Sequence, residues 1–341
     1  MNASRTVAAR ALALVIFTVA AVAPVAGAEA PIAIAIHAGA GTILRADLSA
    51  EREREIRDAL ESAIRSGHDI LSGGGSSLDA VTHAVQLLED TPFFNAGRGA
   101  VFNAEGRHEL DASIMDGSNL DAGAIAGVHN VRNPILLARR VMTDSVHVML
   151  SGAGAETFAR DQGLDFADDA YFHTDYRWRQ LQEARAAESG TDAALPASPN
   201  RWLSTVGAVA LDRAGNLAAA TSTGGMTNKR WGRIGDSPII GAGTYADNRS
   251  CAVSATGHGE YFIRATVARD TCARVQFNGA ALERAADEVI NGQLRRMGGD
   301  GGIIAIERNG EIALTFNTPG MYRARIGVDG ELFVGIYHEE D

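Results

Sequence analysis

Thr205 stands at the first position of an alternating apolar run, Thr205–Asp212, that is typical of a buried strand. The stretch before it, Gly190–Trp202, is polar and contains Pro196 and Pro199, as exposed linkers do. If the chain were cut before Thr205, this residue would carry both a hydroxyl and a free α-amine. An α-amine titrates at about 8, so much of it is neutral at ordinary pH and can accept the hydroxyl proton. The pattern predicts a nucleophile that carries its own base.

The residues that follow Thr205 predict a hairpin. A turn containing Gly215 leads into a second apolar run, Leu217–Ala220, which ends in Thr221–Lys229. Two strands joined by a short glycine-containing turn pair with each other. Thr223 is therefore expected to lie close to Thr205, across paired or neighbouring strands. A β-branched residue at a strand start is also an ordinary structural feature, so Thr205 alone does not establish a nucleophile.

Hydrophobic periodicity predicts the elements that must position this hairpin. Ser49 is a suitable N-cap for a helix that Gly67 would end. Strands grouped together, with helices before and after them, indicate an α+β fold in which two sheets stack between helical layers. A polar linker is predicted at about 186–204. The other predicted helices are 77–89, 133–143, 259–276 and 280–295, and the predicted strands outside the hairpin are 31–37, 99–103, 109–116, 122–128, 146–150, 251–254 and a strand–turn–strand unit at 302–316.

Further motifs follow the hairpin, in the blocks Gly232–Pro238 and Thr256–Glu260. In this order and spacing, the sequence resembles the plant-type asparaginase and isoaspartyl peptidase family of N-terminal-nucleophile hydrolases, threonine peptidases of the T2 type. The resemblance covers nearly the whole chain from Ile32 onward. It also includes the blocks His37–Thr42, Phe94–Phe102, His108–Ala112, Gly298–Gly302 and Phe316–Thr318.

The resemblance implies a four-layer αββα sandwich and self-cleavage between Ser204 and Thr205. The products would be an α subunit, 29–204, and a β subunit, 205–341, which together form one structural domain. The resemblance also implies a dimer of cleaved protomers. Ser204 replaces the usual glycine, so self-cleavage is expected to be slower, because glycine tolerates strained backbone best. His258 replaces a common threonine, and its effect at the pocket rim is left open.

By the same resemblance, Thr223 would donate a hydrogen bond to the Thr205 hydroxyl and orient it. Thr205 would form an acyl-enzyme, and its tetrahedral oxyanion would need fixed donors. The Thr256 hydroxyl and the Gly257 N–H fit that role, because glycine lets the backbone approach closely. Asn95 is expected to face the site or to fix its loop.

Arg233 and Asp236 are closely spaced opposite charges, which most often form a surface ion pair. The resemblance instead implies that Arg233 holds a substrate α-carboxylate in fork geometry while Asp236 accepts from the α-ammonium. The carbonyl of Gly259 would also contact the ammonium. These contacts select a free amino-acid head, as in L-asparagine or a β-aspartyl dipeptide.

The chemistry would require no cofactor, but the resemblance implies a sodium ion held by backbone carbonyls of one loop. Carbonyl oxygens suit hard cations. The residues concerned are Leu88, Glu89, Thr91, Phe94, Ala96 and Arg98.

Two other functions remain as alternatives. A glycosylasparaginase would remove sugar-linked asparagine, but that resemblance expects Asn-Gly where this chain has Gly224-Gly225. A non-catalytic amino-acid-binding protein would use Arg233 and Asp236 and would leave the linker before Thr205 unexplained. Gly152–Gly154 resembles a dinucleotide turn but lacks the third glycine of that motif, so it is expected to begin a helix.

The first 28 residues are typical of a signal peptide. Arg5 and Arg10 precede the apolar run Ala11–Val25, and Ala26–Ala28 supplies a small-residue cleavage site. We therefore expect export, to the periplasm or out of the cell. Removal of residues 1–28 changes the formal net charge from −11 to −13. Such acidity disfavours nucleic acid or anionic membranes as partners and leaves a small molecule or dipeptide as the expected substrate.

The sequence contains two cysteines, Cys251 and Cys272. A disulfide is consistent with export. Their placement in an expected strand and an expected helix nevertheless favours two buried free thiols. Neither arrangement forms a metal site.

Overall fold

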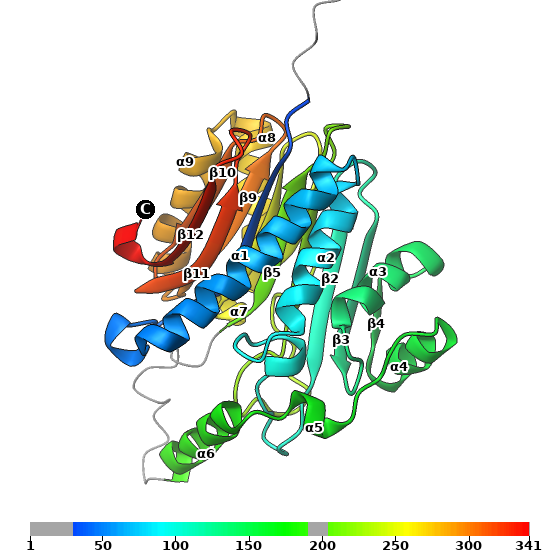
Figure 1. Ribbon diagram of the computed structural model, residues 1–341, viewed down its shortest axis with the longest axis vertical. Helices are drawn as coiled ribbons and strands as arrows, with labels where there is room; N and C mark the ends of the chain where they lie inside the picture. The colour runs from blue at the N-terminus through cyan, green and yellow to red at the C-terminus, as the bar shows by residue number, and fades with distance from the viewer. Residues whose placement is uncertain (1–29, 190–203, 341) are drawn as a thin grey trace, which may run out of the picture.

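The computed structural model describes residues 30–189 and 204–340 (Figure 1). Within them, an eight-stranded sheet has the order β12-β11-β1-β5-β6-β2-β3-β4, and a four-stranded sheet has the order β10-β9-β8-β7. Neighbouring strands are antiparallel except for the parallel pair β3 and β4. The strands are β1 Ala33–Gly41, β2 Leu110–Asp116, β3 Ala122–Val128, β4 Met149–Ser151, β5 Val206–Leu211, β6 Leu217–Thr223, β7 Thr244–Ala246, β8 Cys251–Gly257, β9 Gly301–Glu307, β10 Ile312–Phe316, β11 Gly320–Ile326 and β12 Leu332–Tyr337.

Helices α1, α2 and α3 pack against one face of the large sheet, whereas α8 and α9 pack against the small sheet (Figure 1). None of the helices in the described residues combines the length and apolar character needed to cross a bilayer. The helices are α1 Ala50–Ser72, α2 Ser77–Glu89, α3 Pro134–Asp144, α4 Gly152–Asp161, α5 Asp169–Phe172, α6 Asp175–Ser189, α7 Gly259–Ala265, α8 Val267–Asn278 and α9 Leu282–Asp287, which is followed by a π-helical turn at Glu288–Leu294.

Two hydrophobic cores lie on opposite faces of the large sheet. Along β1, Ile34 and Ile36 enter the core beneath α1 and α2, while Ala33 and Ala35 enter the core shared with the small sheet. All four side chains are fully buried. A strand covered on both faces is expected to be apolar on both, and Ala33–Ile36 meets that requirement.

Several predicted elements are confirmed, and one predicted helix is longer than expected. Helix α2 has the predicted bounds, and the Ser76 hydroxyl caps it by accepting from the Asp79 N–H. Helix α4 begins at Gly152, as expected. Helix α1 continues through Gly67 to Ser72 instead of ending there. A Cβ at Gly67 would lie 2.6 Å from Ile34 Cδ1, so this glycine serves close packing on the sheet rather than helix termination.

The predicted strand at 99–103 is wrong. A short 3₁₀ turn, Gly97–Gly99, occupies its start, and the following residues form an irregular loop. The predicted helix 259–276 is two helices, because Thr266 adopts a left-handed conformation with φ 48° between α7 and α8. Strands β11 and β12 were not predicted. Helix α6 extends to Ser189, into the predicted linker; residues 190–203, like the predicted signal peptide, lie outside the described residues.

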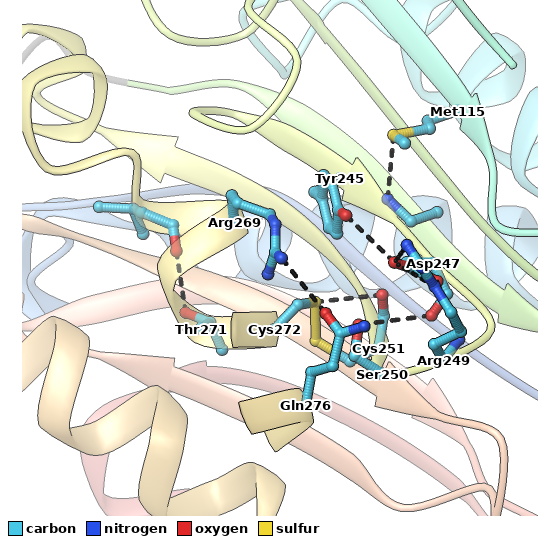
Figure 2. The surroundings of a disulfide bond; sticks show 12 residues. Met115, Tyr245, Asp247, Arg249, Ser250, Cys251, Arg269, Thr271, Cys272 and Gln276 are labelled. Atoms are coloured by element: carbon cyan, nitrogen blue, oxygen red, sulfur yellow. Dashed lines mark hydrogen bonds and ion pairs between the residues drawn. A yellow bond between two sulfur atoms is a disulfide. The ribbon is translucent and has the colours of Figure 1, made fainter. Parts of the chain in front are cut away.

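The prediction of free thiols is also wrong. Cys251 on β8 and Cys272 on α8 form a disulfide with a Cα–Cα separation of 5.3 Å (Figure 2). Both residues are fully buried. The expected strand and helix are present, but α8 packs directly on β8 and brings the two sulfurs together. A disulfide of this kind typically contributes about 2–4 kcal/mol to stability.

Candidate active site

The hairpin of β5 and β6 places two threonine hydroxyls in contact. Val206 pairs with Ser222, so Thr205 lies beside Thr223 at the end of the ladder. Thr205 Oγ1 donates to Thr223 Oγ1 at 3.0 Å, and both residues are buried. This direction is opposite to the expected one. In the uncut chain, the Thr223 hydroxyl instead donates to the Ser204 carbonyl at 3.3 Å.

Asn95 gives the same carbonyl a second donor. Its Nδ2 atom lies 2.7 Å from Ser204 O and 2.7 Å from Gly225 O, and its Oδ1 atom accepts from the Val101 N–H at 2.9 Å. The side chain is fully buried. Asn95 therefore both fixes its loop and polarises the carbonyl that precedes Thr205.

A small cavity opens beside the two threonines. Arg233, Asp236 and Gly257 line it together with Thr205 and Thr223. Thr256 is adjacent in sequence but does not line the cavity; its hydroxyl accepts from the Ala40 N–H at 3.3 Å. Gly257 adopts φ 153°, a conformation that favours glycine.

Gly259 also lies next to the cavity rather than on its wall. A Cβ there would fall 2.8 Å from Asp236 Oδ1 and 2.9 Å from Arg233 Nη2. Only glycine therefore lets the start of α7 pack so closely against these two charged side chains.

Arg233 and Asp236 do not form an ion pair with each other among the described residues, so the alternative of a simple surface pair is not what the structure has. Arg233 is instead held in a fork by Glu260, with Nε–Oε1 and Nη2–Oε2 distances of 2.8 Å each. Glu260 was not predicted as a partner, because α7 brings it to Arg233 only through tertiary packing. His258, at the start of the same helix, has its Nε2 atom 3.4 Å from Glu260 Oε2.

Asp236 is buried in an environment that disfavours its charge. Its Oδ2 atom has no hydrogen-bond partner within the described residues. Burial raises the pKa of the Asp236 carboxyl to about 7, and the Arg233 charge opposes that rise. A cationic ligand group at this oxygen would satisfy the carboxylate and favour its ionised form.

His37 is a buried residue whose contact with Thr205 was not predicted. Its Nδ1 atom lies 3.0 Å from the Thr205 carbonyl oxygen, and its Nε2 atom lies 2.9 Å from Ser254 Oγ. Burial lowers the pKa of the imidazole to about 3, so the ring is neutral at ordinary pH. Because a carbonyl only accepts, Nδ1 carries the hydrogen and Nε2 accepts from Ser254.

We expect His37→Asn and His37→Gln to separate these two contacts. In His37→Asn, the amide nitrogen takes the position of Nδ1 and can still donate to Thr205 O. In His37→Gln, the amide group takes the position of Nε2, so it contacts Ser254 and leaves Thr205 O without this donor. Leaving the buried Thr205 carbonyl unpaired costs about 1–3 kcal/mol of stability. Because this carbonyl helps to hold Thr205 in place, we expect His37→Gln to lower kcat as well. His37→Asn should retain most of the wild-type rate. Steady-state kinetics on matured protein measures both, and equal losses would contradict a specific role for the Nδ1 contact.

Comparison with known proteins agrees with the motifs. The sequence profile described as "Asparaginase" matches residues 30–336. The chain therefore belongs to the asparaginase family.

Three relatives illustrate the likeness, each over most of both chains. The isoaspartyl peptidase of Escherichia coli (strain K12) is 51% identical over 310 residues, which cover 90% of this chain and 96% of the relative. The isoaspartyl peptidase/L-asparaginase of Xenopus laevis is 42% identical over 308 residues, covering 90% and 96%. The probable isoaspartyl peptidase/L-asparaginase 2 of Arabidopsis thaliana is 42% identical over 325 residues, covering 89% and 98%.

Proposed function

We propose that this protein is an autoprocessing hydrolase that cleaves β-aspartyl dipeptides and L-asparagine through an acyl-enzyme on Thr205. The observation that carries the proposal is the contact between the Thr205 and Thr223 hydroxyls beside a cavity lined by Arg233 and Asp236. The names of the relatives, isoaspartyl peptidase and L-asparaginase, support the same substrates. We further propose the four-layer αββα sandwich, which the two sheets and the helices packed on each of them support.

Self-cleavage would begin with attack of Thr205 Oγ1 on the Ser204 carbonyl carbon. The negative charge on Ser204 O would be stabilised by Asn95 Nδ2 and the Thr223 hydroxyl. The Ser204–Thr205 C–N bond breaks, and an ester on Thr205 forms as the nitrogen takes up a proton. Water then hydrolyses the ester to give fragments 29–204 and 205–341. Gly39 leaves room for Ser204, because a Cβ there would lie 2.9 Å from the serine Cβ.

Removal of the Asn95 amide should slow self-cleavage. Loss of one such donor typically costs about 10²–10³ in rate. Asn95→Asp is the informative change, because it keeps an oxygen to accept from the Val101 N–H and loses the donor to Ser204 O. The uncut chain, followed by mass spectrometry from the time of synthesis, should persist far longer in Asn95→Asp and Asn95→Ala. Processing at the wild-type rate in both variants would exclude this role.

After cleavage, the free α-amine of Thr205 would take the hydroxyl proton, and Oγ1 would attack the substrate side-chain amide. The Gly257 N–H and the Thr256 hydroxyl would donate to the oxyanion, and the Thr256 oxygen can at the same time keep accepting from the Ala40 N–H. The amide C–N bond breaks as the leaving nitrogen takes the proton from the Thr205 ammonium. Water then releases aspartate from the ester.

The same cavity offers groups for the aspartyl head. Arg233 would exchange the Glu260 carboxylate for the substrate α-carboxylate, which presents the same two oxygens to the fork. Asp236 would accept from the α-ammonium with its Oδ2 atom, and the Gly259 carbonyl would be the second acceptor. Because Asp236 must be ionised, this contact is strongest above the pKa of about 7 and weakens as the pH falls below it.

We propose that backbone carbonyls within Leu88–Arg98 bind a small hard cation, because carbonyl oxygens suit such ions. A Cβ at Gly97 would lie 2.6 Å from Glu89 O, and one at Gly99 would lie 2.9 Å from Pro92 O, so glycine at both positions lets the backbone pass close to these carbonyls. Within the described residues, His, Cys, Asp and Glu side chains form no metal-binding group of three. From the family resemblance we propose carbonyl ligation of sodium, which would stiffen the loop that carries Asn95. The ligands are the carbonyls of Leu88, Glu89, Thr91, Phe94, Ala96 and Arg98.

Export and assembly complete the proposal. The disulfide between Cys251 and Cys272 supports an oxidising compartment, as a signal peptide at 1–28 would require. A dimer of cleaved protomers is proposed from the family resemblance.

Release of aspartate from a β-aspartyl dipeptide and of ammonia from L-asparagine tests the activity directly. Faster release of aspartate from glycosylated asparagine would favour the glycosylasparaginase alternative. Tight binding of asparagine without any product would favour a binding protein.

A further inference from the structure

A second cavity, of about 280 Å³, shares Ser204 as a lining residue with the small cavity that contains Thr205. Its walls come from Gly39 near the end of β1, from Ile43 in the segment that follows, from Phe93 and Tyr322, and from α6. Ser204 lines both cavities. Ligand sites commonly measure about 300–1,000 Å³, so this space suits a ligand the size of a single residue.

Arg177 is the cationic side chain on the wall of this larger cavity. It projects from α6 and is 5% exposed. Its Nε atom donates to Gly99 O at 2.8 Å and its Nη1 atom donates to Gln180 Oε1 at 2.9 Å. Both partners are neutral, and none of the carboxylates in the described residues lies within 4 Å of the guanidinium.

Among the described residues this buried guanidinium has no carboxylate partner, which is unfavourable in the free protein. Burial lowers the pKa of Arg177, which shows that its surroundings disfavour the charge. Buried charges in proteins are usually paired, so an anionic ligand would relieve this cost. A carboxylate that enters the cavity would meet Arg177 where little water competes.

Taken together with the proposed function, on which it rests, this geometry points to a subsite for the leaving residue of a β-aspartyl dipeptide, with Arg177 binding its α-carboxylate. The aspartyl head occupies the cavity of Arg233 and Asp236, and its side-chain carbonyl meets Thr205 Oγ1. The leaving nitrogen then faces the space beyond Ser204, which cleavage of the chain frees from its covalent link to Thr205.

The reaction on such a substrate conserves atoms and protons. The bond between the aspartyl Cγ and the leaving nitrogen breaks, and the ester to Thr205 Oγ1 forms. The nitrogen takes one proton from the Thr205 ammonium and departs as a free amino acid with its carboxylate intact. L-Asparagine releases only ammonia, which does not extend to Arg177.

The other walls indicate which leaving residues fit. Phe93, Ile43 and Tyr322 are apolar or aromatic, and Asp47 is acidic. An apolar or basic leaving side chain is therefore favoured, whereas a second carboxylate would be repelled by Asp47.

Arg177→Gln tests the subsite in matured enzyme, with three substrates compared side by side. These are β-aspartyl-leucine, its C-terminal amide, and L-asparagine. Breaking a buried charge pair costs about 2–5 kcal/mol, so kcat/KM for β-aspartyl-leucine should fall roughly 30-fold or more, mainly through KM. For the C-terminal amide and for L-asparagine, kcat/KM should fall much less. Arg177→Lys should keep part of the preference for β-aspartyl-leucine over its amide. Arg179→Gln is the matched control, because this neighbouring arginine is exposed on the same helix.

Equal losses on all three substrates would overturn the subsite, because they would indicate that Arg177 only supports the loop through Gly99 O. An unchanged kcat/KM for β-aspartyl-leucine would overturn it as well. A wild-type enzyme without activity on any of the three would instead refute the proposed function. A second readout uses Asp47→Asn, which should raise kcat/KM for β-aspartyl-glutamate relative to β-aspartyl-leucine.

Discussion

Thr205→Ala is expected to leave one uncut chain and to remove turnover of both L-asparagine and β-aspartyl dipeptides. The substitution deletes the hydroxyl that would attack Ser204 during maturation and the substrate afterwards. Loss of a nucleophile in a hydrolase typically costs about 10⁴–10⁶ in kcat. Intact mass spectrometry should show no fragment beginning at residue 205, and ammonia release should be at background.

Thr205→Ser is the matched control for this variant. Serine keeps the hydroxyl that contacts Thr223 and loses only a methyl group, so it should still cut and still turn over, at reduced rates. A Thr205→Ala chain that is cut at the same bond would show that another residue performs the cleavage. A Thr205→Ala enzyme that turns over at the wild-type rate would exclude the acyl-enzyme.

Arg233→Ala carries the second largest expected effect. The Arg233 guanidinium is mostly buried and holds a carboxylate in a two-point fork, which we propose the substrate takes over from Glu260. Losing one partner of a buried charge pair costs about 2–5 kcal/mol, which corresponds to a fall in kcat/KM of roughly 30- to several-thousand-fold. Arg233→Lys should recover only part of the lost kcat/KM, because an ammonium is a point charge that cannot hold both carboxylate oxygens in a fork.

Arg230→Ala controls for the loss of positive charge in the same loop. Arg230 is exposed and pairs with Glu188 at the surface, so its replacement should leave kcat/KM close to the wild-type value. Self-cleavage of Arg233→Ala provides a check on folding, since Arg233 does not contact the Ser204 carbonyl. A wild-type KM for L-asparagine in Arg233→Ala would refute the carboxylate clamp.

The sequence correctly predicted elements that depend on neighbouring residues, such as a capped amphipathic helix and a hairpin with a short turn. Helix α2 has an N-cap serine at its start and an apolar face along its length, and its bounds matched the prediction. The hairpin of β5 and β6 follows from two apolar runs and a short turn, which is why the proximity of Thr205 and Thr223 could be inferred. Gly67 shows the limit of such inference, because the sequence alone does not distinguish a terminating glycine from one that allows close packing.

The contacts that sequence reasoning missed join residues that are far apart in the chain. His37 meets Thr205 across adjacent strands 168 positions apart, and Asn95 reaches Ser204 from a loop 109 positions away. Glu260 reaches Arg233 only because α7 begins beside the cavity. Cys251 and Cys272 pair because α8 packs on β8. Each contact depends on how elements pack, which hydrophobic periodicity does not specify.

The free amine of Thr205 is the centre of the proposed chemistry, and the composition of the chain makes it unusually easy to test. Lys229 is the only lysine in the sequence, and it is buried, with its Nζ atom 3.0 Å from Glu109 O. An amine-reactive reagent at near-neutral pH should therefore label the two chain termini of the matured protein in preference to any side chain. Mass spectrometry of each fragment then gives the fraction of Thr205 amines that are blocked.

Turnover measured against that fraction is the most direct test. We predict that activity falls in proportion to labelling of the fragment that begins at Thr205. Labelling of the other fragment should leave activity unchanged. Full activity with that amine completely blocked would contradict the proposed mechanism.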